Sequence, residues 1–270
     1  MTMAIGCLKC RCLVASTTLV LASPAIAQGF AAYVTPPRVE AKVQPGETLR
    51  QVIEIQHAGL TRGTYRFYTN DWEFTKDRSV KFQDALAPDS CRPWVAIERR
   101  ELALDPGSKY RYRFEISPPA GTAPRECRFA LMVEGLEPAK VQSAVAIPVG
   151  GRIAVVVYVA IGDAKPELKL SGVEVEARDG RKTMFLRVHN AGNAHGRLEG
   201  FLDAKPARGS AVELSPVDSP ILAGETRRIQ LIPAEGDGDR AQELLRSPIH
   251  LKGRLEWNGG TMPVDISLSP

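Results

Sequence analysis

Short segments in which apolar and polar residues alternate recur along almost the whole chain, and this pattern limits the fold more than any other feature. The alternation is clear in residues 39–43, 64–68 and 110–116. In a strand, successive side chains point to opposite faces, so such a segment buries one face and exposes the other. Turn-forming pairs such as Pro45-Gly46 and Asp179-Gly180 separate the segments. Many short strands with regularly spaced turns predict an antiparallel β-sandwich.

The strand pattern continues through the second half of the chain, which indicates two domains. Further strands are expected at residues 183–188, 198–202, 228–232, 249–257 and 262–268. A sandwich of this type needs about 100 residues, so the chain has room for two. Glycine and proline in residues 162–166 suit a boundary. We therefore predict an N-terminal domain over residues 28–163 and a C-terminal domain over 164–270, with one short helical candidate at 240–245.

The first 27 residues have the features of a secretory signal peptide. Lys9 and Arg11 precede an uncharged apolar run over residues 12–26, and a small-x-small pattern ends at Ala27. The run is shorter than the ~20 apolar residues that a membrane-spanning helix needs. We expect cleavage after Ala27 and residence in the periplasm, without lipid attachment because Gln28 is not a cysteine. A buried helix of the fold is the alternative interpretation.

Cleavage would change both the charge and the cysteine content. Lys9 and Arg11 are the only charged residues of the segment, so the formal net charge would fall from +4 to +2. A chain so close to neutral attracts nucleic acid only weakly. Cys91 and Cys127 would be the two cysteines left, and an oxidising compartment favours one disulfide between them. Two buried free thiols are the alternative, whereas two sulfurs without a nearby histidine do not make a zinc site.

The sequence lacks the short motifs that accompany catalysis or nucleotide binding. It contains no G-x-S-x-G, no phosphate-binding glycine loop and no dinucleotide fingerprint. His189 and His195 flank an Asn/Gly turn without the H-E-x-x-H spacing of a zinc site. Cys91 and Cys127 are too far apart for a C-x-x-C redox pair. We therefore expect a non-enzymatic protein without a metal, cofactor or nucleotide.

Four stretches of sequence carry a resemblance to a known family. They are VTPPRV at 34–39 with QPGE at 44–47, CRPWV at 91–95 with LALDPG at 102–107, RECRFALMVEG at 125–135, and GRIAV at 151–155. In this order and spacing they resemble the periplasmic chaperones of pilus assembly by the chaperone–usher pathway. The paired cysteines and the Gly-Arg-Ile stretch look like the divergent branches outside the P-pilus type. The resemblance covers the mature chain and implies two immunoglobulin-like antiparallel β-sandwich domains in tandem.

The resemblance also implies that the first domain lends a strand to an incomplete subunit, a form of β-augmentation. The candidate strand alternates, and its bulky apolar face consists of Val141, Val145, Ile147 and Val149. Burying these four side chains would contribute roughly 6–12 kcal/mol before ordering costs. Pro148 favours an edge strand, although it also removes one N–H donor from pairing. An ordinary core strand is the alternative interpretation.

Members of the family hold the subunit's C-terminal carboxylate between two basic residues in the cleft between the domains. Arg38 matches the first of these positions. The second is usually a lysine of the lent strand, and the nearest basic residue here is Arg152. A guanidinium suits a carboxylate and contributes roughly 1.5–3 kcal/mol through charge-assisted hydrogen bonds. The lysine-to-arginine change and the Gly150-Gly151 pair leave the register open, and solvated surface arginines are the alternative.

The function predicted from the sequence is a chaperone that holds pilus or surface-fibre subunits and delivers them to an outer-membrane usher. Neither nucleic acid nor nucleotide is an expected partner. An exported ligand- or carbohydrate-binding sandwich is an alternative that needs an exposed aromatic platform. Its candidate residues are Trp72, Trp94 and Trp257, of which Trp94 is expected in the core. A structural surface protein is a third interpretation.

Overall fold

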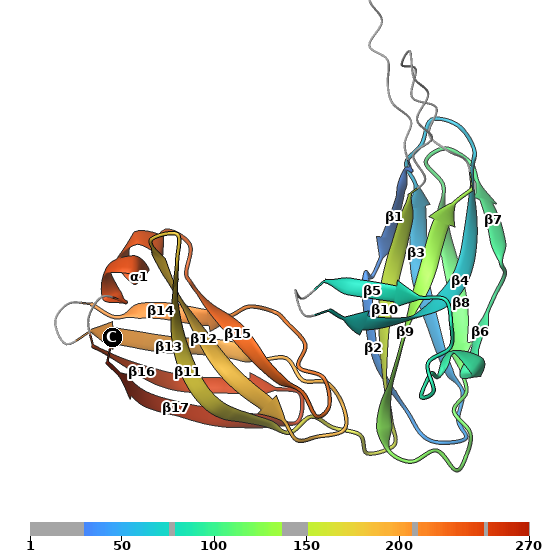
Figure 1. Ribbon diagram of the computed structural model, residues 1–270. Coiled ribbons are helices and arrows are strands. Elements are labelled where there is room, and N and C mark those ends of the chain that lie inside the picture. Colours follow the sequence, from blue (N-terminus) through green and yellow to red (C-terminus); the bar gives the residue numbers. More distant parts are fainter. Residues whose placement is uncertain (1–29, 76–78, 137–150, 207–209, 246–247, 270) are drawn as a thin grey trace, which may run out of the picture.

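The computed structural model contains two β-sandwich domains set at an angle to each other (Figure 1). It describes residues 30–75, 79–136, 151–206, 210–245 and 248–269. The predicted signal peptide and the predicted lent strand lie outside these ranges. The prediction of two immunoglobulin-like sandwiches built almost entirely of strands is confirmed. The predicted domain boundary falls between Ile161, where β10 ends, and Leu168, where β11 begins.

The first domain packs a four-stranded sheet against a six-stranded sheet. The smaller sheet has the order β1 (Ala32–Thr35), β3 (Leu49–His57), β8 (Lys109–Ile116) and β6 (Val95–Ile97). The larger sheet has the order β2 (Arg38–Val43), β10 (Arg152–Ile161), β9 (Arg125–Gly135), β4 (Gly63–Phe74) and β5 (Val80–Gln83). Strand β7 (Glu101–Leu104) also pairs with β4, and the short 3-10 helix η1 (Arg92–Trp94) precedes β6.

The first strand segment is divided between the two sheets. Strand β1 pairs antiparallel with β3 as far as Thr35. Pro36 and Pro37 follow, and because proline has no N–H donor the ladder ends there. Strand β2 then pairs parallel with β10, with Arg38 opposite Val156. This crossing places Arg38 at the start of an edge strand of the larger sheet.

The core of the first domain follows the period-two alternation of its strands. In β8, Tyr112, Phe114 and Ile116 are buried, whereas Arg111 and Arg113, which alternate with them, are exposed. The ring of Tyr112 stacks on Phe67 of β4 with ring centroids 4.0 Å apart, which joins the two sheets across the core. The alternation that predicted the strands therefore also selects the buried residues.

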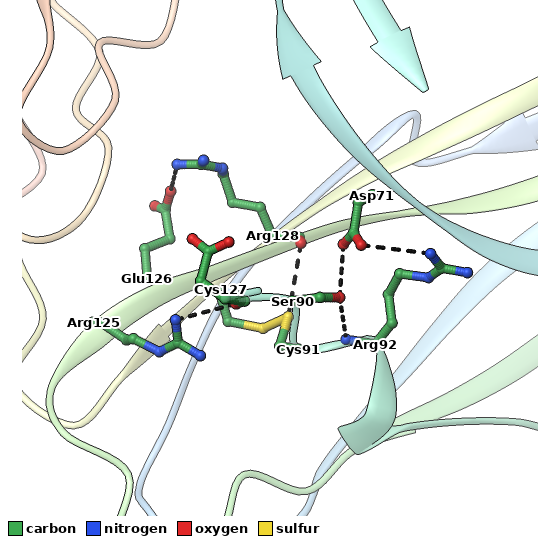
Figure 2. Close-up of a disulfide and its surroundings, with 9 residues drawn as sticks. Asp71, Ser90, Cys91, Arg92, Arg125, Glu126, Cys127 and Arg128 are labelled. Carbon is green, nitrogen blue, oxygen red and sulfur yellow. Dashed lines mark hydrogen bonds and ion pairs between the residues drawn. A yellow bond between two sulfur atoms is a disulfide. The ribbon is translucent and has the colours of Figure 1, made fainter. Parts of the chain in front are cut away.

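The predicted disulfide between Cys91 and Cys127 is present (Figure 2). It joins the segment before η1 to strand β9, with the two Cα atoms 5.8 Å apart, and both residues are buried. A polar cluster lies beside it: Ser90 Oγ donates to Asp71 at 2.8 Å, and the Arg92 amide donates to Ser90 Oγ at 3.2 Å. The long connection between β5 and β6 is thereby fastened to the larger sheet.

The second domain is one continuous sheet that folds over its own core. Its order is β11 (Leu168–Arg178), β12 (Arg181–Asn190), β15 (Thr226–Pro233), β14 (Val212–Pro216), β13 (Glu199–Pro206), β16 (Ile249–Trp257) and β17 (Gly260–Leu268). The only α-helix in the described part of the chain is α1 (Gly238–Leu244), at the predicted helical candidate. Its buried residues Ala241 and Leu244 join the core of this domain.

Removing the disulfide should destabilise the first domain. A Cys91→Ala/Cys127→Ala variant should have a free energy of unfolding about 3–4 kcal/mol lower, because the bond closes a loop with a sequence separation of 36. Urea unfolding at neutral pH measures this difference. The reduced wild-type protein is the control and should match the variant. A difference under about 0.5 kcal/mol would show that the bond contributes little to stability.

Candidate functional site

The two domains meet at a polar cleft of about 510 Å³. Strands β2, β9 and β10 line it from the first domain, and the segments around residues 194–199 and 258–259 line it from the second. The charged and aromatic residues on its walls are Arg38, Glu40, Lys42, Glu126, Tyr158, Lys165, His195, Arg197 and Glu199. A cleft with this lining suits a charged or polar segment of a partner rather than an apolar small molecule.

The turn that follows β12 shapes the second-domain side of the cleft around one buried amide. Asn190 has no exposed surface. Its Oδ1 accepts hydrogen bonds from the amides of Glu167 at 3.1 Å and Gly192 at 2.9 Å. Its Nδ2 donates to the carbonyls of Ala194 and Ile221, each at 2.8 Å. Because both atoms of the amide are satisfied by backbone groups, this side chain fixes the path of the turn.

The same turn is hydrogen-bonded to the first domain and to the connection between the domains. Asn193 Nδ2 donates to the Pro124 carbonyl at 2.8 Å, and the Glu126 amide donates to the Asn193 carbonyl at 2.9 Å. The Lys165 amide donates to Asn193 Oδ1 at 2.9 Å. A Cβ on Gly192 would collide with the backbone at Lys165, so only glycine fits there. The turn therefore holds the two domains in one orientation.

His195, which belongs to the second domain, contacts two carboxylates of the first domain. Its side chain is only 8% exposed, and that of Glu126 is 3% exposed. Nδ1 contacts Glu126, Nε2 lies 3.4 Å from Glu40, and the ring stacks on Tyr158 with centroids 4.0 Å apart. Burial lowers the pKa of His195, but the hydrogen bonds to Glu126 and Glu40 outweigh it, so the pKa is raised. The hydrogen bond to His195 is also the main reason that the pKa of Glu40 is lowered.

Two arginines from different domains share two carboxylates beside this histidine. Arg38 Nε lies 2.8 Å from Glu40 Oε1 and its Nη1 lies 3.2 Å from Asp218 Oδ2. Arg197 Nε lies 3.2 Å from the same Glu40 oxygen and its Nη1 lies 2.6 Å from Asp218 Oδ1. Burial raises the pKa of Asp218, but the hydrogen bonds from Arg197 and Arg38 prevail and the pKa is lowered. The two guanidiniums therefore face the same small region of the cleft.

The hairpin formed by β4 and β5 makes a second contact between the domains, and Figure 1 shows it extending from the first domain toward the second. Trp72 packs edge-on against Tyr158 with ring centroids 5.5 Å apart. Leu222 of the second domain packs on the same aromatic cluster. The guanidinium of Arg227 lies 4.3 Å from the centroid of Phe74. The hairpin thus supports the orientation that the Asn190 turn sets.

The structure places the two predicted carboxylate anchors apart. Arg38 lies in the cleft, as the resemblance implied. Arg152 is exposed at the start of β10, opposite Glu134 and four residues before Val156, the partner of Arg38. At about 3.3 Å per residue this separates them by roughly 13 Å along the strand. The predicted groove residues Val141, Val145, Ile147 and Val149 lie outside the described residues, so their role stays a prediction.

The sequence did not single out Arg197 or Asp218 at all. Arg197 directly follows the Asn/Gly-rich turn, which was the one available signal near it. Asp218 is 180 residues from Arg38 in the sequence, and no pattern relates them. The aromatic platform that a carbohydrate-binding protein needs is not formed by the tryptophans, because Trp72 is buried and Trp94 and Trp257 are half-buried.

Comparison with known proteins finds a shared fold. No protein-family model and no curated protein matches the sequence. The YadV chaperone is 11% identical, with 88% of this chain and 100% of that chain covered and a TM-score of 0.47. The Pseudomonas aeruginosa CupB2 chaperone is 12% identical, with the same coverages and TM-score. A chain of the Salmonella enterica SafA pilin–SafB chaperone complex is 10% identical, with 89% and 98% covered and a TM-score of 0.45. The chain is similar in fold to fimbrial chaperones.

The residues that the structure describes form neither a metal site nor a membrane-spanning helix. No group of three or more histidine, cysteine, aspartate or glutamate side chains there is placed to hold a metal ion. Nor does that part of the chain contain a helix with the length and apolar character needed to cross a membrane.

The contact between His195 and its two carboxylates should make the stability of the protein depend on pH. Because the pKa of His195 is raised in the folded state, its contribution is complete below about 6.5 and is lost as the pH rises through the folded-state value. His195→Gln should lower the free energy of unfolding by about 1.5–3 kcal/mol at pH 5.5 and by less at pH 9. Urea unfolding at both pH values measures this.

His189→Gln is the matched control, because the neighbour of His189 is the neutral hydroxyl of Thr226 at 3.0 Å. That variant should show no such difference between the two pH values. An equal loss for His195→Gln at pH 5.5 and pH 9 would mean that the protonated ring does not join the domains.

Proposed function

We propose that this protein is a periplasmic chaperone that binds pilus or surface-fibre subunits by lending them a strand, and that it delivers them to an outer-membrane usher. It acts through binding alone, without catalysis. The predicted signal peptide supports export to the periplasm. The proposal rests chiefly on the edge of the larger sheet in the first domain.

The observation that carries the proposal is an open stretch of that edge. Strand β2 covers β10 only from Val156 to Ile161. Within the described residues, no strand pairs with Arg152–Val155 on the side away from β9. Free N–H and C=O groups on such an edge are a template for a strand from another chain. The predicted lent residues directly precede this stretch in the sequence, so they would extend the same edge.

The cleft lies where such a strand would have to stop. A partner segment running parallel to β10 along its open edge meets β2 at Arg38, because Arg38 is the first residue of β2 and pairs with Val156. The end of the segment then lies beside the guanidinium of Arg38 in the cleft. A C-terminal carboxylate is the chain end that a guanidinium binds best. Arg38 therefore serves as an anchor, and the role of Arg152 stays a prediction.

The class of partner follows from the lent strand. A strand with bulky apolar side chains on one face completes a sandwich that lacks a strand, which is the state expected of a pilus subunit. Among the solved structures similar in fold, SafB is described in complex with the pilin SafA. We propose a subunit of the same kind for this chain, held in a one-to-one complex.

The apolar face of the lent strand should be essential for capture. Ile147→Asp should weaken subunit binding at least tenfold, since it removes roughly 1.5–3 kcal/mol of burial and puts a charge into the subunit groove. The protein is purified from the periplasm of cells that express the neighbouring genes, and bound proteins are identified by mass spectrometry. The wild type should carry a small β-rich partner at one-to-one stoichiometry, and Ile147→Asp should carry little or none.

Gln142→Asp is the matched control, because it places the same charge on the opposite face of the segment and should leave capture intact. A clean wild-type monomer without a partner would refute the chaperone function. Equal capture by Ile147→Asp and the wild type would instead show that another segment is lent.

A further inference from the structure

Asp218 shows how the two arginines of the cleft hold a carboxylate. One of its oxygens lies 3.2 Å from Nη1 of Arg38, and the other lies 2.6 Å from Nη1 of Arg197. Each oxygen thus has its own guanidinium, and the two guanidiniums come from different domains. Charge-assisted contacts to both oxygens are the arrangement in which arginines bind carboxylates most strongly. The two arginines are therefore arranged to bind a carboxylate even when no partner is present.

The two arginines are held in place without Asp218. The side chain of Arg197 is only 12% exposed and its guanidinium lies 5.8 Å from the centroid of the Tyr158 ring. Glu40 contacts Nε of both Arg38 and Arg197, so it holds them through a different nitrogen from the one that Asp218 contacts. A ligand that replaced Asp218 would find both guanidiniums already oriented, which lowers the ordering cost of binding.

Asp218 itself is the member of the cluster most easily displaced. Its side chain is 63% exposed, against 40% for Arg38 and Glu40. The backbone around it is anchored: the Val217 amide donates to the Gln230 carbonyl at 2.9 Å, and Arg227 Nη1 donates to Ser219 Oγ at 3.2 Å. Rotation of the Asp218 side chain alone therefore opens the site, without movement of the loop.

Charge favours a replacement carboxylate once Asp218 has turned away. Two guanidiniums would then face Glu40 as the one carboxylate that contacts both. Among Arg38, Arg197 and Glu40 that leaves an excess of one positive charge in a partly buried place, where an anion is bound more strongly than in open water. A free C-terminus supplies the negative charge that balances it, whereas an amidated or internal peptide segment does not.

We infer that Arg38 and Arg197 together form the carboxylate site of the cleft and that Asp218 occupies it until the C-terminal carboxylate of a partner displaces it. The inference rests on the proposed function, because that function supplies a chain end at Arg38. It assigns the second anchor to the C-terminal domain rather than to Arg152, which lies beside Glu134. Binding of the chain end then depends on the orientation of both domains.

The test uses the mature chain labelled with ¹⁵N-arginine and two probes. One probe is an acetylated octapeptide of alternating threonine and valine with a free C-terminal carboxylate, and the other is the same peptide with a C-terminal amide. Asp218→Asn should bind the carboxylate peptide about tenfold or more tightly than the amide, and the Nε–H signals of Arg38 and Arg197 should shift. In the wild type this preference should be smaller, because Asp218 competes.

Two further variants, each made in the Asp218→Asn background, decide which arginine acts with Arg38. Arg197→Gln should abolish the preference for the carboxylate, and Arg152→Gln should keep it. Arg197→Lys keeps the positive charge but cannot donate two parallel hydrogen bonds, so it should keep part of the preference. If Arg197→Gln does not fold, this variant still tests the role of Arg197. Equal affinity for the two peptides in Asp218→Asn, absence of binding included, would overturn the inference, as would a preference that follows Arg152.

The outcome is separable from that of the chaperone test. A carboxylate preference that follows Arg197, in a protein that captures no subunit, would support the two-arginine site and refute the chaperone function. Subunit capture that Ile147→Asp abolishes, together with equal affinity for the two peptides, would support the chaperone function and refute the two-arginine site.

Discussion

The parallel pairing of β2 with β10 is the interaction on which the other features of the candidate site depend. It begins at Arg38 and Val156 and ends at Val43 and Ile161. Because it begins there, no described strand pairs with the earlier part of β10 on the side away from β9, and Arg38 stands at the end of that edge. Because it continues to Ile161, the same strand leads directly into the connection with the second domain. One ladder of hydrogen bonds thus sets the edge, the place of Arg38 and the position of the cleft.

The shape of the cleft depends on polar contacts that form only when the two domains are packed against each other. Asn190 and Asn193 satisfy backbone groups of the turn, the connection and the first domain. His195 contacts the nearly buried Glu126, and a buried carboxylate without a partner is costly. The hairpin of β4 and β5 adds aromatic packing on the flank. The orientation of the domains is therefore part of the site, because Arg38 and Arg197 share Glu40 and Asp218 only in this arrangement.

If the cleft binds a chain end as proposed, Asp218 has a physical consequence for specificity. As long as Asp218 neutralises the two arginines, weakly bound anions gain little by entering, since they must replace contacts that already exist. A chain end that also pairs along β10 gains backbone hydrogen bonds in addition. The site would then favour a carboxylate delivered by a strand over a free anion.

Several features followed from the sequence alone because they depend on local pattern. Period-two alternation determined the strands and their buried faces, as in Tyr112 and Phe114. The predicted loss of the first three cysteines with the signal peptide left Cys91 and Cys127 as the expected pair, and the structure confirms this disulfide. Tertiary structure decided which strands pair, the break between β1 and β2, and the meeting of Arg197 and Asp218 with Arg38. Local periodicity reports which face of a strand is buried, but it contains no information on contacts between residues as far apart as Arg38 and Asp218, which exist only once both domains have folded and docked.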